Sequence, residues 1–131
     1  MRRIIYISRS RLGDNRHALD AMVAQSSVRN NAAGITGMLW LSGGEIVQAL
    51  EGEDPAVSQL MERIAADSRH SNIVVVEDRN VQSRMFGSWG MATPKDNSAS
   101  IASTAYLLGY CKAQDAPSAD RIVQLLLIHG E

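Results

Sequence analysis

The 131-residue sequence predicts an α+β domain of the ferredoxin-like type, with the element order βαββαββ. Runs of β-branched and aromatic residues alternate with segments whose apolar residues repeat at helical spacing. Two of the strand runs are joined by Ser42-Gly43-Gly44, in which paired glycines supply the positive φ angles of a tight hairpin. We therefore expect two helices on one face of the sheet and C-terminal helices on the other.

The first strand and the first helix are predicted before residue 32. Residues 3–9 are rich in β-branched and aromatic side chains, which favour a strand. Asp14 is the expected N-cap of a helix that ends near Asn30 or Asn31. The inward positions of this helix follow the spacing i, i+3, i+4, i+7: Leu19, Met22, Val23 and Ser26.

A hairpin and a second helix follow. Strands are predicted at 35–41 and 45–50, on either side of the glycine turn. Asp54 and Pro55 give a cap and a proline at the first helical position, so a helix should run from there to about Asp67. Its apolar residues repeat at helical spacing: Val57, Leu60, Met61 and Ile64.

The remaining chain contains two more strands and two more helices. The strands are predicted at 73–76 and 86–92. The composition becomes polar after Pro94, and helices are then predicted at 101–112 and 119–129. Because the first two helices cover one face of the sheet, these apolar helices are expected to cover the second face.

We interpret residues 1–93 as one domain and residues 94–131 as its helical extension, which acts as a cap or an interaction segment. The sequence contains no signal-peptide pattern and no stretch near the ~20 apolar residues of a membrane span. Its one cysteine, Cys111, excludes an internal disulfide and is predicted to be a small core residue. These features predict a cytoplasmic protein without membrane contact.

Composition and motifs argue against several functions. The net charge is −1 and no basic block is present, which disfavours nucleic-acid binding. The histidines lie far apart and lack the spacing of metal ligands: His17, His70 and His129. No nucleophile motif such as Gly-x-Ser-x-Gly occurs, and Glu51 and Asp54 are interpreted as part of an acidic turn before a helix. We therefore expect neither an enzyme nor a metal protein.

A phenol and a carboxamide are the most informative polar residues. Gln48 lies in an apolar strand and is predicted to be buried, so its amide must find hydrogen-bond partners. By strand alternation Gln48 shares a face with Ile46 and Leu50, and Tyr6 shares a face with Ile4 and Ser8. If these faces are the same one, the Tyr6 hydroxyl and the Gln48 amide meet beneath the two helices. They then form either a functional pair or a hydrogen bond that only satisfies the core.

Five short motifs in order resemble the BLUF domain, a flavin-binding blue-light sensor. They are Tyr6-x-Ser8; Asn30 before Gly34-Ile35-Thr36-Gly37; Gln48-x-Leu50-Glu51-Gly52; Asp67-x-Arg69-His70; and Arg84-x-Phe86-x-x-Trp89-x-Met91. Each motif is weak alone, but the five together are specific. The resemblance covers about residues 3–93 and indicates a short, stand-alone member, since residues 94–131 match nothing diagnostic.

The resemblance implies that FAD lies between the two helices that pack on the sheet, with its ring edge toward the strands. The implied contacts are Tyr6, Ser8, Met22, Val23, Arg29, Asn30, Gln48, Arg63, Ile64, Asp67 and His70. Met22, Val23 and Ile64 would face the ring, and Asn30 and Gln48 its polar edge. Residues near the end of the second helix would reach the ribityl and phosphate groups.

The resemblance also implies a photochemical cycle. Blue light drives an electron and then a proton from Tyr6 to the flavin, and the Gln48 amide rotates or changes tautomer. Trp89 and Met91, two residues apart on the last strand, are expected to relay the change to residues 101–129. The receiver is expected to be a homo-oligomer contact or an unknown protein partner.

Two alternatives from other classes remain. A flavin-dependent redox enzyme would need a nicotinamide site, but Gly-x-Gly-x-x-Gly is absent. A ferredoxin-like interaction module without a cofactor would use the tyrosine and glutamine only as core. Purified protein distinguishes this last alternative, because a module without flavin is colourless.

Overall fold

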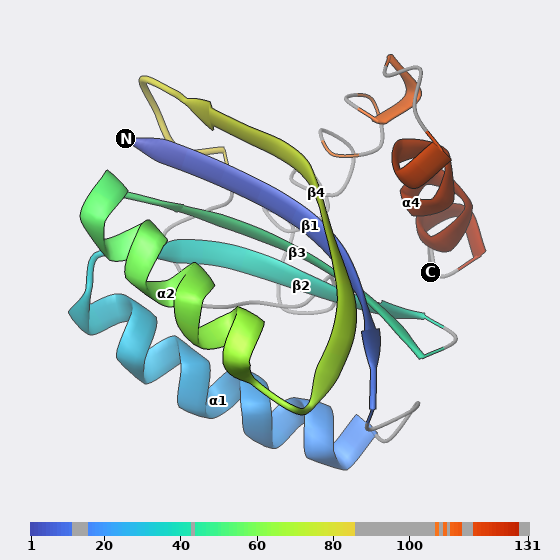
Figure 1. The fold of residues 1–131 in the computed structure, drawn as a ribbon, viewed down its shortest axis with the longest axis horizontal. Coiled ribbons are helices and arrows are strands. Elements are labelled where there is room, and N and C mark those ends of the chain that lie inside the picture. Colours follow the sequence, from blue (N-terminus) through green and yellow to red (C-terminus); the bar gives the residue numbers. More distant parts are fainter. Residues whose placement is uncertain are drawn as a thin grey trace.

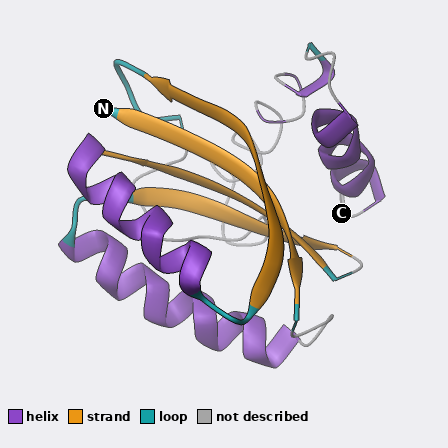
Figure 2. Cartoon of the chain, viewed as in Figure 1, coloured by secondary structure: helices purple, strands orange, loops and turns teal. Residues whose placement is uncertain are grey.

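The computed structural model describes residues 1–11, 16–42, 44–85, 107, 109, 111–113 and 117–128. The elements in this part of the chain are β1 (Arg2–Ser10), α1 (Arg16–Ala32), β2 (Thr36–Ser42), β3 (Glu45–Gly52), α2 (Asp54–Ala66), β4 (His70–Asn80) and α4 (Pro117–Ile128). Figure 2 shows the helices and strands along the chain. No helix among the described residues has the length and apolar content needed to cross a bilayer.

The described strands form one antiparallel sheet in the order β2-β3-β1-β4. This order is that of the ferredoxin-like fold, so the predicted fold class is confirmed. Figure 1 shows α1 and α2 side by side on one face of the twisted sheet and α4 beyond the other face. The central strands β1 and β3 therefore lie between two helical layers.

Two separate apolar clusters lie on the two faces of the sheet. Under α1 and α2, the buried cluster is Ile4, Tyr6, Ile35, Leu39, Ile46, Leu50 and Val57. On the opposite face it is Ile5, Ile7, Met38, Trp40, Val47, Ala49, Leu107, Cys111, Ala119 and Ile122. C-terminal residues thus cover the second face as expected, and Cys111 is a core residue.

Glycines determine how α1 leads into β2. Gly34 has a φ of +73° after the end of α1, and the Ile35 amide donates to the Asn30 carbonyl at 2.8 Å. The Gly34 amide donates to the Asn31 carbonyl at 3.2 Å, which completes a Schellman cap. The cap ends the helix at Ala32, one residue after Asn31. Gly37 then lets β2 approach β3, because a Cβ there would lie 2.2 Å from the Ala49 carbonyl oxygen.

The start of α2 differs from the prediction. The N-cap is Glu53, which makes no side-chain capping bond, and Asp54 is the first helical residue. The Asp54 carboxylate instead accepts hydrogen bonds from Arg2 at 2.9 Å and from Ser58 at 3.2 Å. The proline still lies in the first turn, where its missing N–H is harmless.

Strand β4 is much longer than the predicted 73–76, because it runs the full length of β1. Its register against β1 shifts twice, and Asn72 has a φ of +56°. The predicted strand 86–92 lies outside the described residues. The same holds for most of the predicted helix 101–112, of which residues 107, 109, 111 and 112 are described and are helical.

Candidate functional site

Tyr6 and Gln48 lie directly opposite each other in the pairing of β1 with β3. Both side chains point to the face covered by α1 and α2, and the Tyr6 hydroxyl donates a hydrogen bond to Gln48 Oε1. Tyr6 is 1% exposed and Gln48 is 8% exposed, so water competes little for this bond. The two polar residues singled out from the sequence are therefore in contact beneath the two helices.

The environment of Tyr6 keeps its phenol protonated. Burial raises the pKa of Tyr6 far above its usual range, and the negative charge of Asp67 raises it further. The hydroxyl is therefore a donor at every physiological pH. Because its oxygen accepts from Tyr6, the Gln48 amide directs its two N–H donors elsewhere.

His70 extends this polar group along β1. Its Nε2 contacts the Ile64 carbonyl at 2.9 Å, and a carbonyl can only accept, so Nε2 carries a proton. In the neutral ring, Nδ1 then accepts from the buried Ser8 hydroxyl at 2.9 Å. The rings of Tyr6 and His70 lie 6.1 Å apart between centroids. Ser8, His70 and Ile64 thus tie the end of α2 to β1, next to Tyr6.

Asp67 follows α2 and has a fixed partner. Arg69 donates to both carboxylate oxygens through its side chain, at 2.6–3.0 Å, and through its backbone amide at 2.9 Å. These hydrogen bonds hold the pKa of Asp67 at about 2, below its ordinary value of 3.8. Asp67 therefore carries a constant negative charge near Tyr6 and His70.

The other predicted contacts divide into two groups. Met22, Val23 and Ile64 are half-buried and pack against the apolar cluster that contains Tyr6. Asn30 is 4% exposed in the last turn of α1. Arg29 and Arg63 are exposed on α1 and α2. The structure thus brings the apolar residues and Asn30 to the side of the helices that faces the sheet, whereas Arg29 and Arg63 lie at the surface. Trp89 and Met91 lie outside the described residues.

A buried charged cluster on the opposite face was not predicted. Glu51, interpreted from the sequence as part of an acidic turn, is the fully buried penultimate residue of β3. Its carboxylate accepts from Arg3 Nε at 2.7 Å, and Arg3 also lies 3.5 Å from Glu77. Glu77 pairs with Arg79 as well, and its Oε2 is buried without a hydrogen-bond partner. The alternation of β3 carries the signal that was missed, since Glu51 shares a face with Val47 and Ala49.

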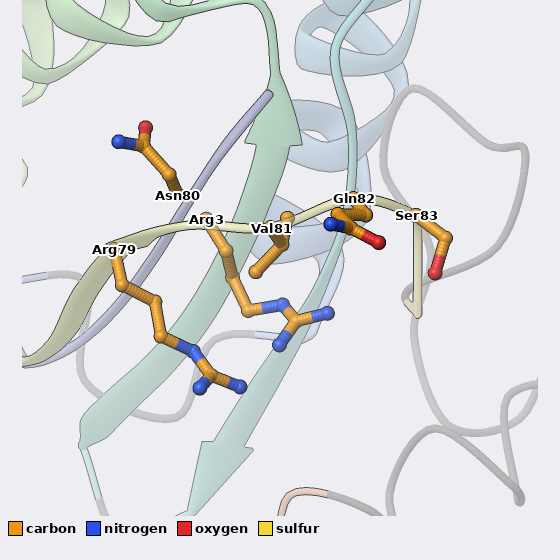
Figure 3. Close-up of a pocket in the computed structure, with 6 residues that line it drawn as sticks. All are labelled: Arg3, Arg79, Asn80, Val81, Gln82 and Ser83. Carbon is orange, nitrogen blue, oxygen red and sulfur yellow. The ribbon is translucent and has the colours of Figure 1, made fainter.

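A pocket of about 310 Å³ borders this charged cluster and is shown in Figure 3. It is lined by Arg3, Arg79, Asn80, Val81, Gln82 and Ser83. Arg3 and Arg79 extend to the same side of the sheet, whereas Asn80 points the other way. Since Arg3 lies on the face opposite Tyr6, the pocket is separate from the tyrosine–glutamine pair. Among the described residues, no group of three or more metal-type ligands is present.

Known proteins are similar to this chain over most of its length. The family model described as BLUF, sensors of blue light using FAD, matches residues 1–92. The photoactivated adenylate cyclase subunit beta of Euglena gracilis is 32% identical over 93 residues, which are 70% of this chain and 11% of the relative. The chain therefore spans a small part of the length of such curated relatives.

Solved structures show the same likeness. BlrB, a BLUF protein in its dark state, superposes with a TM-score of 0.69 at 27% identity, covering 98% of this chain and 96% of that chain. Klebsiella pneumoniae BlrP1 with FMN and cyclic diGMP has a TM-score of 0.65 at 33% identity, covering 70% of this chain and 25% of that chain. The chain belongs to the BLUF family of flavin-binding blue-light sensors. This is a family of signalling modules, although some relatives carry the sensor within a larger enzyme.

Proposed function

We propose that this chain is a blue-light photoreceptor that holds FAD non-covalently between α1 and α2, with Tyr6 and Gln48 as its photoactive pair. The observation that carries this proposal is the Tyr6–Gln48 hydrogen bond, buried on the sheet face beneath both helices. A bond that only satisfied the core would need no further polar groups nearby. Here Asn30, Ser8 and His70 lie on the same side of the sheet or its helices.

The side chains in this region fit a flavin. Half-buried Met22 and Val23 from α1 and Ile64 from α2 offer apolar surface to a planar ring. Asn30 and Gln48 offer donors and acceptors to its polar edge. Exposed Arg63, in the last turn of α2, offers positive charge to the ribityl and phosphate groups. Exposed Arg29 lies beside Asn30 in the last turn of α1 and is a further proposed contact at that end. Ser8, Asp67 and His70 complete the proposed contacts near the end of α2.

Tyr6 is arranged to lose an electron before it loses a proton. Its raised pKa makes direct deprotonation unfavourable, whereas the constant negative charge of Asp67 favours removal of an electron. An oxidised phenol is strongly acidic, so its proton then leaves along the existing bond to Gln48 Oε1. Bound flavin supplies the absorption of blue light and the capacity to accept the electron.

Gln48 supplies the rearrangement. A carboxamide has an acceptor at one end and donors at the other, so rotation or tautomerisation exchanges which group faces Tyr6. Each rearranged hydrogen bond is worth about 1 kcal/mol. One or two such bonds can shift a conformational equilibrium only if its two states already have nearly equal free energies. The output is therefore a local shift in the sheet.

The output region is proposed on the same basis. Residues 1–93 form the sensory domain, and residues 94–131 form a helical extension that contacts a partner or a second copy of the chain in the cytoplasm. Support comes from Leu107, Cys111, Ala119 and Ile122, which pack on the face opposite Tyr6. Trp89 and Met91 would relay the change between the two faces.

Purification and illumination test the proposal. The protein should be yellow, release FAD on denaturation, and show a reversible red shift of its oxidised-flavin spectrum in blue light. Chromatography of the released flavin against FAD and FMN standards identifies the cofactor. Colourless protein would support the cofactor-free module, and bleaching to reduced flavin would support a redox enzyme.

A further inference from the structure

The buried carboxylate of Glu51 connects β3 to the chain that follows β4. Glu51 has no exposed surface, and its Oε2 accepts from Arg3 Nε at 2.7 Å. The backbone amide of Met85 donates to the same carboxylate, at 2.8 Å to Oε1 and 3.0 Å to Oε2. Met85 directly precedes residues 86–92, which carry Trp89 and Met91. A side chain of β3 thus holds Met85, the residue directly before that segment.

Glu51 and Gln48 are on the same strand but on opposite faces of the sheet. They are three residues apart, which is about 10 Å along an extended strand. Gln48 faces α1 and α2 with Tyr6, and Glu51 faces the other way with Arg3. A small displacement of β3 that accompanies a change at Gln48 therefore also moves the Glu51 carboxylate.

Arg84, the residue before Met85, is bound to the same end of the sheet as Glu51. Its Nη1 donates to the Thr36 hydroxyl at 2.7 Å and to the Glu51 carbonyl at 2.9 Å. Its Nη2 donates to the Gly34 carbonyl at 2.7 Å. Gly34 belongs to the cap that ends α1, four residues after Asn30. One guanidinium thus joins the end of α1, the start of β2 and the end of β3.

The Met85 amide is shared between two carboxylate oxygens, and one of them also accepts from Arg3. A shared donor can move toward either oxygen without losing its hydrogen bond, so the contact can change at small cost. The Arg3–Glu51 ion pair is buried and is expensive to break. The carboxylate is therefore anchored on one side and adjustable on the other.

We propose that Glu51 and Arg84 are positioning residues that transmit the rearrangement at Gln48 to the segment beginning at residue 86. This inference rests on the proposed function, because it requires the light reaction at Tyr6 and Gln48. Light alters the Glu51–Met85 hydrogen bond through β3, while Arg84 keeps the adjacent Met85 aligned with the ends of β2 and β3. Neither residue is among the proposed flavin contacts.

Amide hydrogen exchange at Met85, measured by NMR in the dark and under steady blue light, tests the proposal. In the unaltered protein, light should change this exchange rate by about fivefold, the effect expected of one altered hydrogen bond. In Glu51→Gln the ratio of light to dark rates should fall to about 1, whereas the flavin content and the red shift remain. Retention of the fivefold ratio in Glu51→Gln would overturn the proposal.

Glu77→Gln is the matched control. It removes a buried negative charge from the same sheet face and from the same neighbour, Arg3, but Glu77 has no bond to Met85 among the described contacts. The light-to-dark ratio at Met85 should therefore stay near its unaltered value. If Glu77→Gln abolished the ratio as Glu51→Gln does, loss of charge in the cluster would explain both results and the proposal would fail.

Arg84→Lys tests the second residue and does not depend on a buried substitution. Arg84 is exposed, and a lysine cannot make the three forked bonds, so the fold should persist while the ratio at Met85 falls below about twofold. An unchanged ratio would remove Arg84 from the proposal. Absence of flavin or of a red shift in the unaltered protein would contradict the proposed function itself. Loss of the red shift only in Glu51→Gln would show that Glu51 acts on Gln48, which overturns transmission.

Discussion

The two faces of the central strands differ in the kind of polar contact they bury. Beneath α1 and α2, β1 and β3 place a neutral phenol against a neutral amide. On the opposite face the same strands place Arg3 against Glu51, with Glu77 close by. Residues three positions apart on the same two strands thus form a neutral pair on one face and an ionic cluster on the other.

The neutral pair can rearrange, whereas the ionic cluster is rigid. A neutral hydrogen bond is worth about 1 kcal/mol net, so its partners can be exchanged with little effect on the fold. Removing one member of a buried ion pair leaves a charge in the interior and costs about 3–5 kcal/mol. The first face can therefore change state, whereas the second keeps the strands in register during the change.

The largest effect is expected from removing the hydroxyl of Tyr6. Tyr6→Phe preserves the ring but removes the proton and the bond to Gln48, so flavin should bind and the light-induced red shift should disappear completely. Absorption spectra before and after blue light measure this result. Gln48→Leu, which removes the amide partner, should have the same outcome.

Trp40→Phe is the control for the tyrosine substitution. Trp40 is a buried aromatic residue of β2 on the opposite face, so its replacement should leave the red shift intact. A normal red shift in Tyr6→Phe would make Tyr6 a core residue and place the electron donor elsewhere. Loss of the shift only in Trp40→Phe would exchange the roles assigned to the two faces.

The ionic face is tested by comparing two adjacent arginines. Arg3→Met leaves Glu51 and Glu77 buried without their shared cation and should lower the free energy of unfolding by about 3–5 kcal/mol. Arg2→Met breaks ion pairs with the exposed Asp54 and Asp78, and should cost less than about 1 kcal/mol. Urea unfolding followed by circular dichroism measures both. Equal losses would mean that the cluster contributes no special rigidity.

A smaller effect is expected at the end of α1. Asn30→Ala removes a buried carboxamide while the backbone cap at Ile35 remains, so flavin retention should weaken about tenfold and the bound fraction should still shift. Titration of the flavin-free protein with FAD measures the affinity. Asn31→Ala removes the adjacent, exposed carboxamide and should leave the affinity unchanged. A reversed result would place the ring edge differently.

The smallest effect concerns Asp67 and pH. Because its pKa is lowered on folding to about 2, Asp67 stabilises the fold above the ordinary value of 3.8 and loses this contribution as the pH falls through about 2. Since Arg69 is more than one-third exposed, the contribution should be about 1 kcal/mol. Asp67→Asn should therefore be less stable than the unaltered protein at pH 7, and most of this difference should be gone near pH 2.

Urea unfolding at both pH values measures this difference, and Asp20→Asn is the control at an exposed helical position. A deficit of the same size at pH 7 and near pH 2 would contradict the assigned ion pair with Arg69.

Local patterns predicted the first face of the molecule better than the second. Alternation along β1 and β3 predicted that Tyr6 and Gln48 share a face, because each strand is apolar on both sides of its polar residue. Glu51 has acidic and glycine neighbours, which resemble a turn in sequence. Alternation along β3 places Glu51 on the same face as Val47 and Ala49, but Arg3, the partner that makes its burial possible, is distant in sequence.

The length of β4 could not be predicted from the sequence either. Its ends are polar, and Val74 and Val75 are 46% and 47% exposed, so neither propensity nor alternation marks its limits. Pairing with the whole of β1 extends the strand beyond its apolar centre, and two register shifts accommodate the difference. Tertiary pairing, which no local window contains, decides these boundaries.

The burial of Cys111 has a consequence for chemical labelling. Burial, together with the charge of Glu77, raises the pKa of the thiol to about 11. At neutral pH only about one molecule in 10⁴ then carries the reactive thiolate, and the surrounding apolar cluster shields it from reagents. The sole cysteine of the chain should therefore react very slowly with alkylating agents while the C-terminal residues stay packed on the sheet. Any condition that separates them would expose it, so the protein carries its own reporter for opening of that layer.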